Sequence, residues 1–157
     1  MTRHKFGLRN KGRLVIILAL VLTLLATSCS KINENAVLVT GIIDGDTIEI
    51  ESGTKVRYIG IDTPEFGEPY YLEATEANRK LVEGKKVRLE KDVEDKDEYG
   101  RLLRYVWVDD TMVNAELVRL GYAYSYSYPP NLKYQARFLR LEKEAREQKR
   151  GLWSNRR

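Results

Sequence analysis

Histidine and cysteine are almost absent from this sequence of 157 residues, which contains one of each, His4 and Cys29. A single cysteine rules out an intrachain disulfide. Because both residues lie within the first thirty, the rest of the chain offers no imidazole and no thiol. This excludes hydrolases built on Ser-His-Asp or Cys-His groups, zinc sites with histidine ligands and a histidine base. Carboxylate, hydroxyl, amine and guanidinium groups remain for any chemistry.

The amino terminus has the pattern of a secretory signal. The first thirteen residues hold five Lys or Arg and no acid, and residues 14–27 form an apolar run that ends at Ser28-Cys29. This pattern predicts a signal peptide over residues 1–28. The uncharged stretch 14–30 is also near the lower limit for spanning a bilayer, about 17–25 residues, so an uncleaved anchor is the alternative. In either case we expect the remainder of the chain to be exported.

Cys29 stands where the apolar run ends. Residues 25–29, LATSC, resemble a bacterial lipobox, in which the cysteine becomes the lipidated first residue of the mature protein. Ala26 stands where a lipobox usually has leucine, and ordinary cleavage after Ser28 is the alternative. We predict a lipoprotein of the cell envelope that is attached to the membrane through Cys29, with residues 29–35 as a tether.

The net charge gives no support for long-range attraction to a polyanion. The chain carries 27 Lys and Arg against 23 Asp and Glu, a formal charge of +4. Five of the basic residues and none of the acids lie in the signal, which leaves 22 against 23 and a net charge of −1. Local arginines and a bound cation would therefore have to capture a polyanion.

Strand patterns dominate the first half of the remaining chain, and helix patterns the second. Val- and Ile-rich runs separated by turn residues predict strands, and apolar positions three or four apart predict helices. We expect Trp153, after Gly151, to fold back onto the core. The order predicts a mainly β domain of the α+β class over residues 36–154, a five-stranded Greek-key barrel with three helices packed around it. The expected strands are 36–43, 47–51, 55–61, 85–91 and 102–108, and the expected helices are 69–83, 113–120 and 131–150.

Two acidic motifs follow predicted strands. Asp44-Gly45 reads first as a hairpin turn, and Asp62 as a turn-initiating residue. The alternative is that Asp46 and Asp62, at the ends of two strands, converge on one cation. Without sulfur or imidazole ligands that cation must be hard, Ca²⁺, Mg²⁺ or Mn²⁺. Two carboxylates, a backbone carbonyl and water would suit Ca²⁺.

Three further residues fit an attack on a phosphodiester. Glu65 is either a surface acid or a base that deprotonates water, a contribution of roughly 10²–10⁴-fold. Arg57 lies in a strand on the face opposite its two neighbours, and facing into a barrel it would need a carboxylate or a phosphate as partner. Arg101 follows Tyr99-Gly100, where glycine permits a close approach. Guanidinium groups bind phosphate oxygens in a bidentate manner.

The motifs together resemble the staphylococcal nuclease-like (thermonuclease) family. They are IDGDT, VRYIGIDTPE, DEYGR, MVNAELVRLGYA and GLWS, and they span residues 37–154. The resemblance implies an OB-fold barrel and Ca²⁺-dependent hydrolysis of DNA and RNA, with single strands preferred and 3′-phosphate and 5′-hydroxyl products. Two departures are Glu98, where members have a lysine, and the short segment 66–69, where members have a longer loop.

Carried over position by position, the resemblance also implies a role for each site residue. Bases are expected to stack on the substrate-binding tyrosines. Two others, Tyr122 and Tyr124, we expect to pack against the domain. Implied metal ligands are Asp46, Asp62 and the backbone carbonyl of Thr63, with Asp44 as an acid beside them; implied catalytic residues are Glu65 as general base with Arg57 and Arg101 on the phosphate; implied substrate-binding residues are Tyr99, Tyr126 and Tyr128.

The sequence therefore predicts an exported Ca²⁺-dependent nuclease, expected to be a monomer. Two alternatives stay open. One is a non-catalytic OB-fold module that binds nucleic acid or protein, because this fold alone does not imply an enzyme. The other is a glycosidase that uses Asp62 and Glu65 as its carboxylate pair, which would leave Arg57 and Arg101 without a task.

Overall fold

The computed structural model describes residues 36–154, which belong to one compact unit of the chain. The predicted signal peptide, the lipidation of Cys29 and the tether over residues 29–35 lie outside the described residues and stay predictions. Within 36–154, no helix has the length and apolar character needed to cross a membrane. The elements in chain order are β1 (Ala36–Ile42), β2 (Thr47–Ile50), β3 (Lys55–Tyr58), β4 (Ile61–Asp62), α2 (Tyr71–Val82), β5 (Lys86–Glu90), β6 (Leu102–Val108), β7 (Thr111–Met112), α3 (Val113–Leu120), β8 (Tyr124–Ser125), α4 (Gln135–Glu147) and the 3₁₀ turn η1 (Gly151–Trp153).

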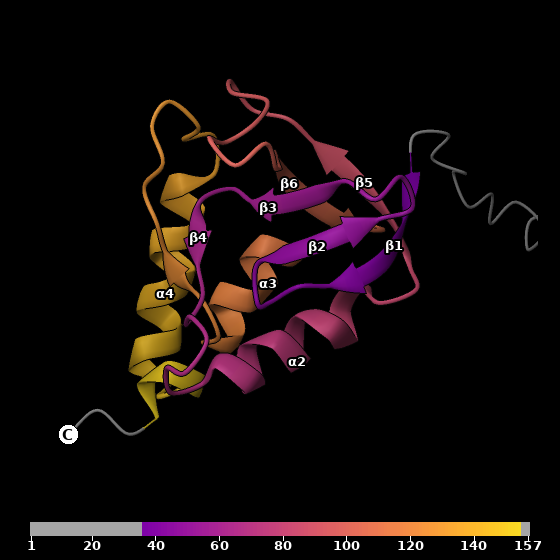
Figure 1. Ribbon diagram of the computed structural model, residues 1–157. Helices are drawn as coiled ribbons and strands as arrows, with labels where there is room; N and C mark the ends of the chain where they lie inside the picture. The colour runs from indigo at the N-terminus through magenta and orange to yellow at the C-terminus, as the bar shows by residue number, and fades with distance from the viewer. Residues whose placement is uncertain (1–35, 155–157) are drawn as a thin grey trace, which may run out of the picture. The chain divides into compact units, whose positions relative to one another are not determined.

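Five strands close into a barrel, which confirms the predicted architecture (Figure 1). Strand β1 pairs with β2 and β5, β2 pairs with β3, and β5 pairs with β6, all antiparallel. The parallel pairing of β3 with β6 completes the circle. Val56 and Tyr58 are buried in the core. Since side chains alternate along a strand, Arg57 between them points out of the barrel and not into it.

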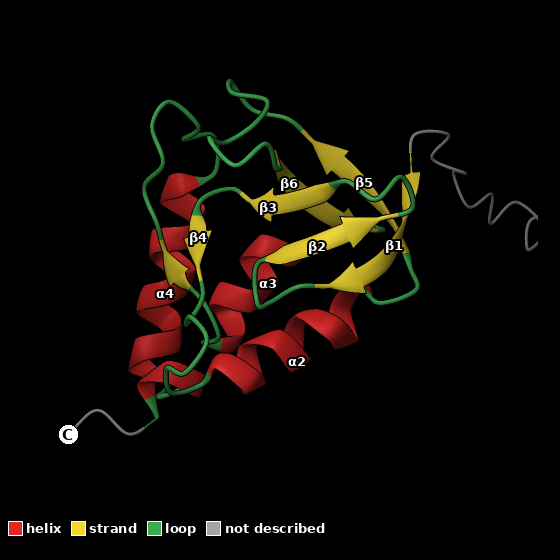
Figure 2. Cartoon of the chain, viewed as in Figure 1, coloured by secondary structure: helices red, strands yellow, loops and turns green. Residues whose placement is uncertain are grey.

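The three helices cover the barrel on one side. In Figure 2, α2 runs below β1 and β2, α4 lies beside β4, and α3 sits between them. Helix α3 packs on α2, α4 and β6. Phe138 and Ala145 are buried along α4, as its spacing predicts. Trp153 is also buried, but in a small separate cluster with Ala145 and Tyr124.

Most predicted element boundaries differ from the observed ones by one to four residues, and local geometry explains two of the differences. The run 55–61 is not one strand, because Gly60 adopts a φ of 79° and turns the chain from β3 into β4. A side chain at Gly60 would also lie 2.5 Å from the ring of Phe138. The last helix begins at Gln135 and not at Asn131, because the buried Asn131 side chain binds the loop after β5.

Candidate active site

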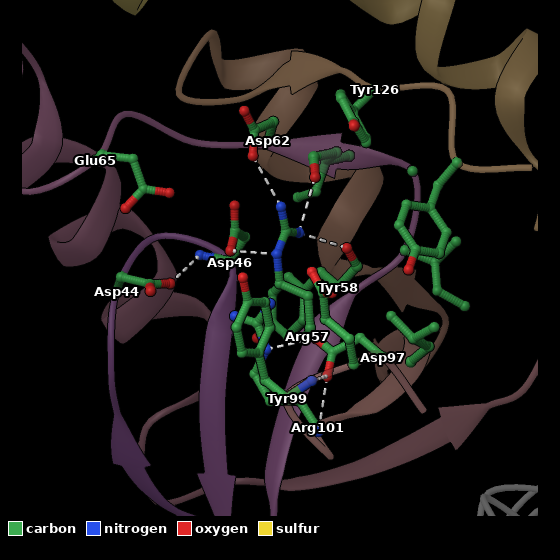
Figure 3. Close-up of a pocket in the computed structure, with 16 residues that line it drawn as sticks. Asp44, Asp46, Arg57, Tyr58, Asp62, Glu65, Asp97, Tyr99, Arg101 and Tyr126 are labelled. Carbon is green, nitrogen blue, oxygen red and sulfur yellow. Dashed lines mark hydrogen bonds and ion pairs between the residues drawn. The ribbon is translucent and has the colours of Figure 1, made fainter. Parts of the chain in front are cut away.

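A cleft of about 340 Å³ opens beside the end of β3. Its walls come from the loop after β1, the β3–β4 turn, the loop between β5 and β6, and the segment that follows β8. Figure 3 shows Arg57 at its centre, with Asp46 and Asp62 above it and Tyr99 and Arg101 below. The predicted site residues that line it are Asp44, Asp46, Arg57, Asp62, Glu65, Tyr99, Arg101, Tyr126 and Tyr128.

Strand register places Arg57 between the two predicted metal carboxylates. Thr47 on β2 is paired with Arg57 on β3, so Asp46 lies beside it. The Arg57 Nε is 3.1 Å from Asp46 Oδ1, and its Nη2 donates to Asp62 Oδ1 at 2.8 Å. Asp46 and Asp62 are thus brought together, but around an arginine.

The Gly60 turn wraps main-chain acceptors around the same guanidinium group. Arg57 Nη1 donates to the carbonyl oxygens of Tyr58 at 2.7 Å and Ile61 at 2.8 Å. With the bond to Asp62, three of its five N–H groups donate hydrogen bonds within residues 36–154, and Nε forms the ion pair with Asp46. The remaining N–H, on Nη2, is the one that a phosphate oxygen can take. Arg57 is therefore fixed in position before any substrate binds.

Asp46 is the most buried acid of the cleft, with 5% of its surface exposed. Its Oδ2 accepts hydrogen bonds from the backbone N–H and the hydroxyl of Thr63, both at 2.9 Å. The pKa of Asp46 is raised to about 6, because burial and the Asp44 carboxylate raise it by more than the Arg57 guanidinium lowers it. Thr63 is buried behind Asp46 and does not line the cleft.

Asp62 and Asp44 complete the acidic side of the cleft. Burial raises the pKa of Asp62, while Arg57 opposes the rise. The Asp44 Oδ1 accepts a hydrogen bond from the backbone N–H of Asp46 at 3.0 Å, an Asx turn. Asp44 thus forms a turn and also lines the acidic cleft, so the two interpretations of this motif are compatible.

Arg101 is held by Asp97, an acid that the sequence analysis did not identify. Its Nε donates to Asp97 Oδ2 at 2.6 Å, and its backbone N–H to Asp97 Oδ1 at 2.9 Å. Among residues 36–154 no partner takes its two terminal nitrogens, which leaves them for a phosphate. The Tyr99 ring lies 5.4 Å from the Arg101 guanidinium carbon, within cation–π range.

Glu65 lines the cleft on the side opposite to Tyr126 (Figure 3). Its backbone N–H donates to Glu68 Oε2 at 2.8 Å, and its carbonyl accepts the N–H of Glu68 at 2.9 Å. Its carboxylate takes no part in a hydrogen bond or ion pair within residues 36–154. Glu65 is thus placed by its main chain, with a side chain that can accept a proton.

The four tyrosines of residues 122–128 differ in their surroundings. Tyr126 and Tyr128 line the cleft, with ring centroids 6.4 Å apart, and the Tyr126 N–H donates to the carbonyl of Gly60 at 3.0 Å. Tyr122 packs against the main core, and Tyr124 packs against Trp153 with ring centroids 5.4 Å apart. Tyr128 also packs against the main core, whereas Tyr126 is 49% exposed. Tyr126 therefore offers the larger ring surface to a ligand.

Comparisons with known proteins identify the family of this chain. The family model for staphylococcal nuclease homologues matches residues 55–155. The chain belongs to the staphylococcal nuclease family. It is 41% identical over 135 residues to the thermonuclease of Staphylococcus hyicus, a match that covers 80% of each chain. It is 44% identical over 123 residues to endonuclease YncB of Bacillus subtilis (strain 168), covering 71% of this chain and 58% of that one.

The staphylococcal nuclease match includes most of the predicted site. Beginning at residue 55, it contains Arg57, Asp62, Glu65 and Arg101. Asp46 lies before its first residue, and the structure joins Asp46 to the matched part through Arg57 and Thr63. The two acidic motifs thus belong to one site.

A hard cation fits the composition of the staphylococcal nuclease cleft. Six carboxylates and two guanidinium groups line it, so its net charge is −4 when all are ionised. Within 36–154 no three His, Cys, Asp or Glu side chains form a metal-binding group. The predicted ligands of the cation are the carboxylates of Asp46 and Asp62, the Thr63 carbonyl and water. Carboxylate and carbonyl oxygens are the ligands that Ca²⁺ prefers.

Sequence reasoning missed three residues that position this staphylococcal nuclease site. Asp97 holds Arg101, and its spacing of four residues from Arg101 was the available signal. The buried Asn131 accepts hydrogen bonds from the N–H groups of Val93 and Glu94, which ties down the loop that carries Tyr99 and Arg101. The buried Asn78 on α2 donates to the carbonyl of Asp44 at 2.9 Å. Neither asparagine has a local signal, because its partners are distant in sequence.

Proposed function

We propose that the protein is an exported, Ca²⁺-dependent nuclease that hydrolyses phosphodiester bonds in DNA and RNA. Membership of the staphylococcal nuclease family and the nuclease names of its relatives support a phosphodiesterase activity. The main observation in favour of Ca²⁺-dependent hydrolysis is that one cleft is lined by Glu65, Arg57 and Arg101 together with Asp46 and Asp62. A glycosidase pair would leave both arginines without a role.

Glu65 is the general base of the proposed reaction. Its carboxylate accepts a proton from water, and the water oxygen forms a bond to phosphorus. The bond from phosphorus to the 5′ oxygen breaks, and that oxygen takes a proton from solvent. The products are a 3′-phosphate and a 5′-hydroxyl.

Arg57 and Arg101 stabilise the negative charge that grows on the phosphoryl oxygens. Arg57 contributes the single N–H that its protein partners leave, and Arg101 contributes its two terminal nitrogens. Since both are fixed by hydrogen bonds, little reorganisation is needed when the charge develops. A Ca²⁺ ion held by Asp46, Asp62 and the Thr63 carbonyl would supply further positive charge beside the phosphate.

The remaining parts of the proposal concern substrate and location. Stacking on Tyr99, Tyr126 and Tyr128 favours unpaired bases, so we propose a preference for single strands. We also propose a monomer of the cell envelope anchored through a lipid on Cys29. Mass spectrometry of the membrane-extracted protein tests the anchor, and an unmodified chain that begins at or after Cys29 would contradict it.

Hydrolysis of single-stranded DNA in millimolar Ca²⁺ and in chelator tests the activity. The variants are Glu65→Gln, which removes the base, and Arg57→Lys, which keeps the charge but loses the planar donor group. The matched control is Glu73→Gln, because Glu73 is an exposed acid on α2 outside the cleft. We expect Ca²⁺-dependent cleavage that falls at least 100-fold in Glu65→Gln, the lower end for a general base. We expect the control to behave as the wild type.

Intact DNA from a folded protein given Ca²⁺, Mg²⁺ and Mn²⁺ in turn would contradict the proposal. It would favour the non-catalytic binding module. Cleavage that persists in chelator would contradict the metal dependence alone. Cleavage at the wild-type rate by Glu65→Gln would remove Glu65 from the mechanism and leave the nuclease assignment intact.

A further inference from the structure

We propose that Phe66 is a second stacking platform, which binds a nucleobase on the Glu65 side of the cleft. The base belongs to the same polynucleotide chain whose phosphate occupies the cleft. This inference rests on the proposed function, and it adds a contact on the side of the scissile phosphate opposite to Tyr126.

Exposed aromatic surface gathers around this one cleft. Among the large hydrophobic side chains of residues 36–154, three aromatic ones are exposed: Phe66 at 86%, Tyr99 at 76% and Tyr126 at 49%. Tyr99 and Tyr126 line the cleft. Phe66 directly follows Glu65, which also lines it. An aromatic ring exposed to this degree contributes little to the core, and its face is accessible to a ligand.

The Phe66 ring is held in place although it is exposed. It makes an edge-to-face contact with Tyr71, with ring centroids 5.5 Å apart and an angle of 84° between the planes. The turn that carries it is closed by hydrogen bonds between Glu65 and Glu68, at 2.8 and 2.9 Å. The Tyr71 N–H donates to the carbonyl of Glu68 at 3.3 Å, which joins the turn to α2. A ring fixed in this way loses little freedom when a base stacks on it.

The path of a bound strand leads to Phe66. Figure 3 shows Glu65 and Tyr126 at opposite sides of the cleft, with Arg57 between them. A polynucleotide extends in both directions from the phosphate held at Arg57. Bases on one side meet Tyr126, so the bases on the other side pass Glu65, next to Phe66.

The charge of the site favours a contact that does not depend on ionic attraction. The cleft carries six acids and two arginines, and the chain after the signal has a net charge of −1. Net charge therefore supplies no long-range attraction for the strand beyond the reacting phosphate. Stacking on an aromatic ring needs no positive charge and tolerates any base, because every base has a π-face.

Cleavage kinetics with modified oligonucleotides test the proposal in the full-length protein. The substrates are single-stranded DNAs with one defined cleavage point and one abasic site moved along the strand. The variants are Phe66→Ala, the conservative Phe66→Trp and the control Leu72→Ala. Leu72 is 73% exposed and nearby on α2 but has no aromatic face. Urea unfolding of each variant verifies that the fold is retained.

We expect Phe66→Ala to raise KM for the intact oligonucleotide about 5- to 150-fold, the range for one stacked base, with kcat unchanged. Phe66→Trp should restore the wild-type KM, and Leu72→Ala should leave it unchanged. In the wild type, an abasic site at one position on the side away from Tyr126 should raise KM equally. The same abasic site should have no added effect in Phe66→Ala.

Failure of this inference and failure of the proposed function give different results. If the wild type cleaves but Phe66→Ala matches it on every oligonucleotide, Phe66 is not a stacking residue and the nuclease stands. The same conclusion follows if Phe66→Ala raises KM no more than Leu72→Ala does. It also follows if the effects of Phe66→Ala and of an abasic site on KM are additive at every position of the abasic site. If the wild type does not cleave, fluorescence anisotropy with the same DNAs decides. The platform is supported if Phe66→Ala binds the intact DNA more weakly and an abasic site at one position causes no further loss of affinity. It is overturned if the affinity does not depend on the position of the abasic site, or if the DNA does not bind.

Discussion

Asp46 should make the stability of the cation-free protein fall as the pH rises. The carboxyl group is almost fully buried, and burial, opposed by Arg57 and assisted by Asp44, raises its pKa from 3.8 to about 6. The folded protein therefore keeps a proton that the unfolded chain releases between these two values. The stability contributed by this proton is fully present below about pH 4 and is lost as the pH rises through about 6.

The size of the effect follows from the shift. Two pKa units at about 1.36 kcal/mol each correspond to about 3 kcal/mol, a large part of the 5–15 kcal/mol typical of a domain. Asp46→Asn has nearly the same shape and does not titrate. The difference in the free energy of unfolding between the two proteins therefore isolates this group. In chelator the wild type should lose about 3 kcal/mol relative to Asp46→Asn between pH 4 and pH 7.

Urea unfolding, followed by the fluorescence of the buried Trp153, measures this difference at each pH. The series is repeated in millimolar Ca²⁺. A cation that binds the ionised carboxylate stabilises the folded protein, so the loss above pH 6 should shrink. A difference that stays constant from pH 4 to 7 would refute the reasoning about burial. The same loss with and without Ca²⁺ would show that Asp46 does not bind the ion.

Two further substitutions test how the fold supports the site. Asn131→Ala leaves the N–H groups of Val93 and Glu94 without their acceptor, so it should lower the free energy of unfolding by about 2–4 kcal/mol; an unchanged urea midpoint would contradict this. Gly60→Ala brings a methyl group to 2.5 Å from Phe138 at a φ of 79° and should cost about 2–5 kcal/mol. The control Gly53→Ala, at a φ of 76° with open space around it, should cost only about 1–2 kcal/mol, and equal losses would rule out the steric clash.

Much of the fold could be predicted because its signals are local. The alternation of apolar residues on β3 and β6 and the spacing of Phe138 and Ala145 on α4 depend on neighbours a few residues away. The break at Gly60 could not be predicted in the same way. Glycine is permitted in a strand or in a turn, and only the close packing of Phe138 decides between them.

The sequence by itself determined which chemistry is available to this protein. With no histidine or cysteine after residue 29, any reaction must use carboxylates and guanidinium groups, and the motifs placed these in a familiar order. The order of strands and helices likewise followed from periodicity and turn residues. These properties belong to the chain itself and need no knowledge of long-range contacts.

Only the tertiary structure decided which groups face one another. Asp46, Asp62 and Arg101 meet at one cleft because β3 pairs with β2 on one side and with β6 on the other. The packing of distant segments also decides two other features. One is the pair of hydrogen bonds from residues 93 and 94 to Asn131, and the other is the exposure of Phe66. Strand register and loop closure join residues far apart in the sequence, and no local pattern encodes them.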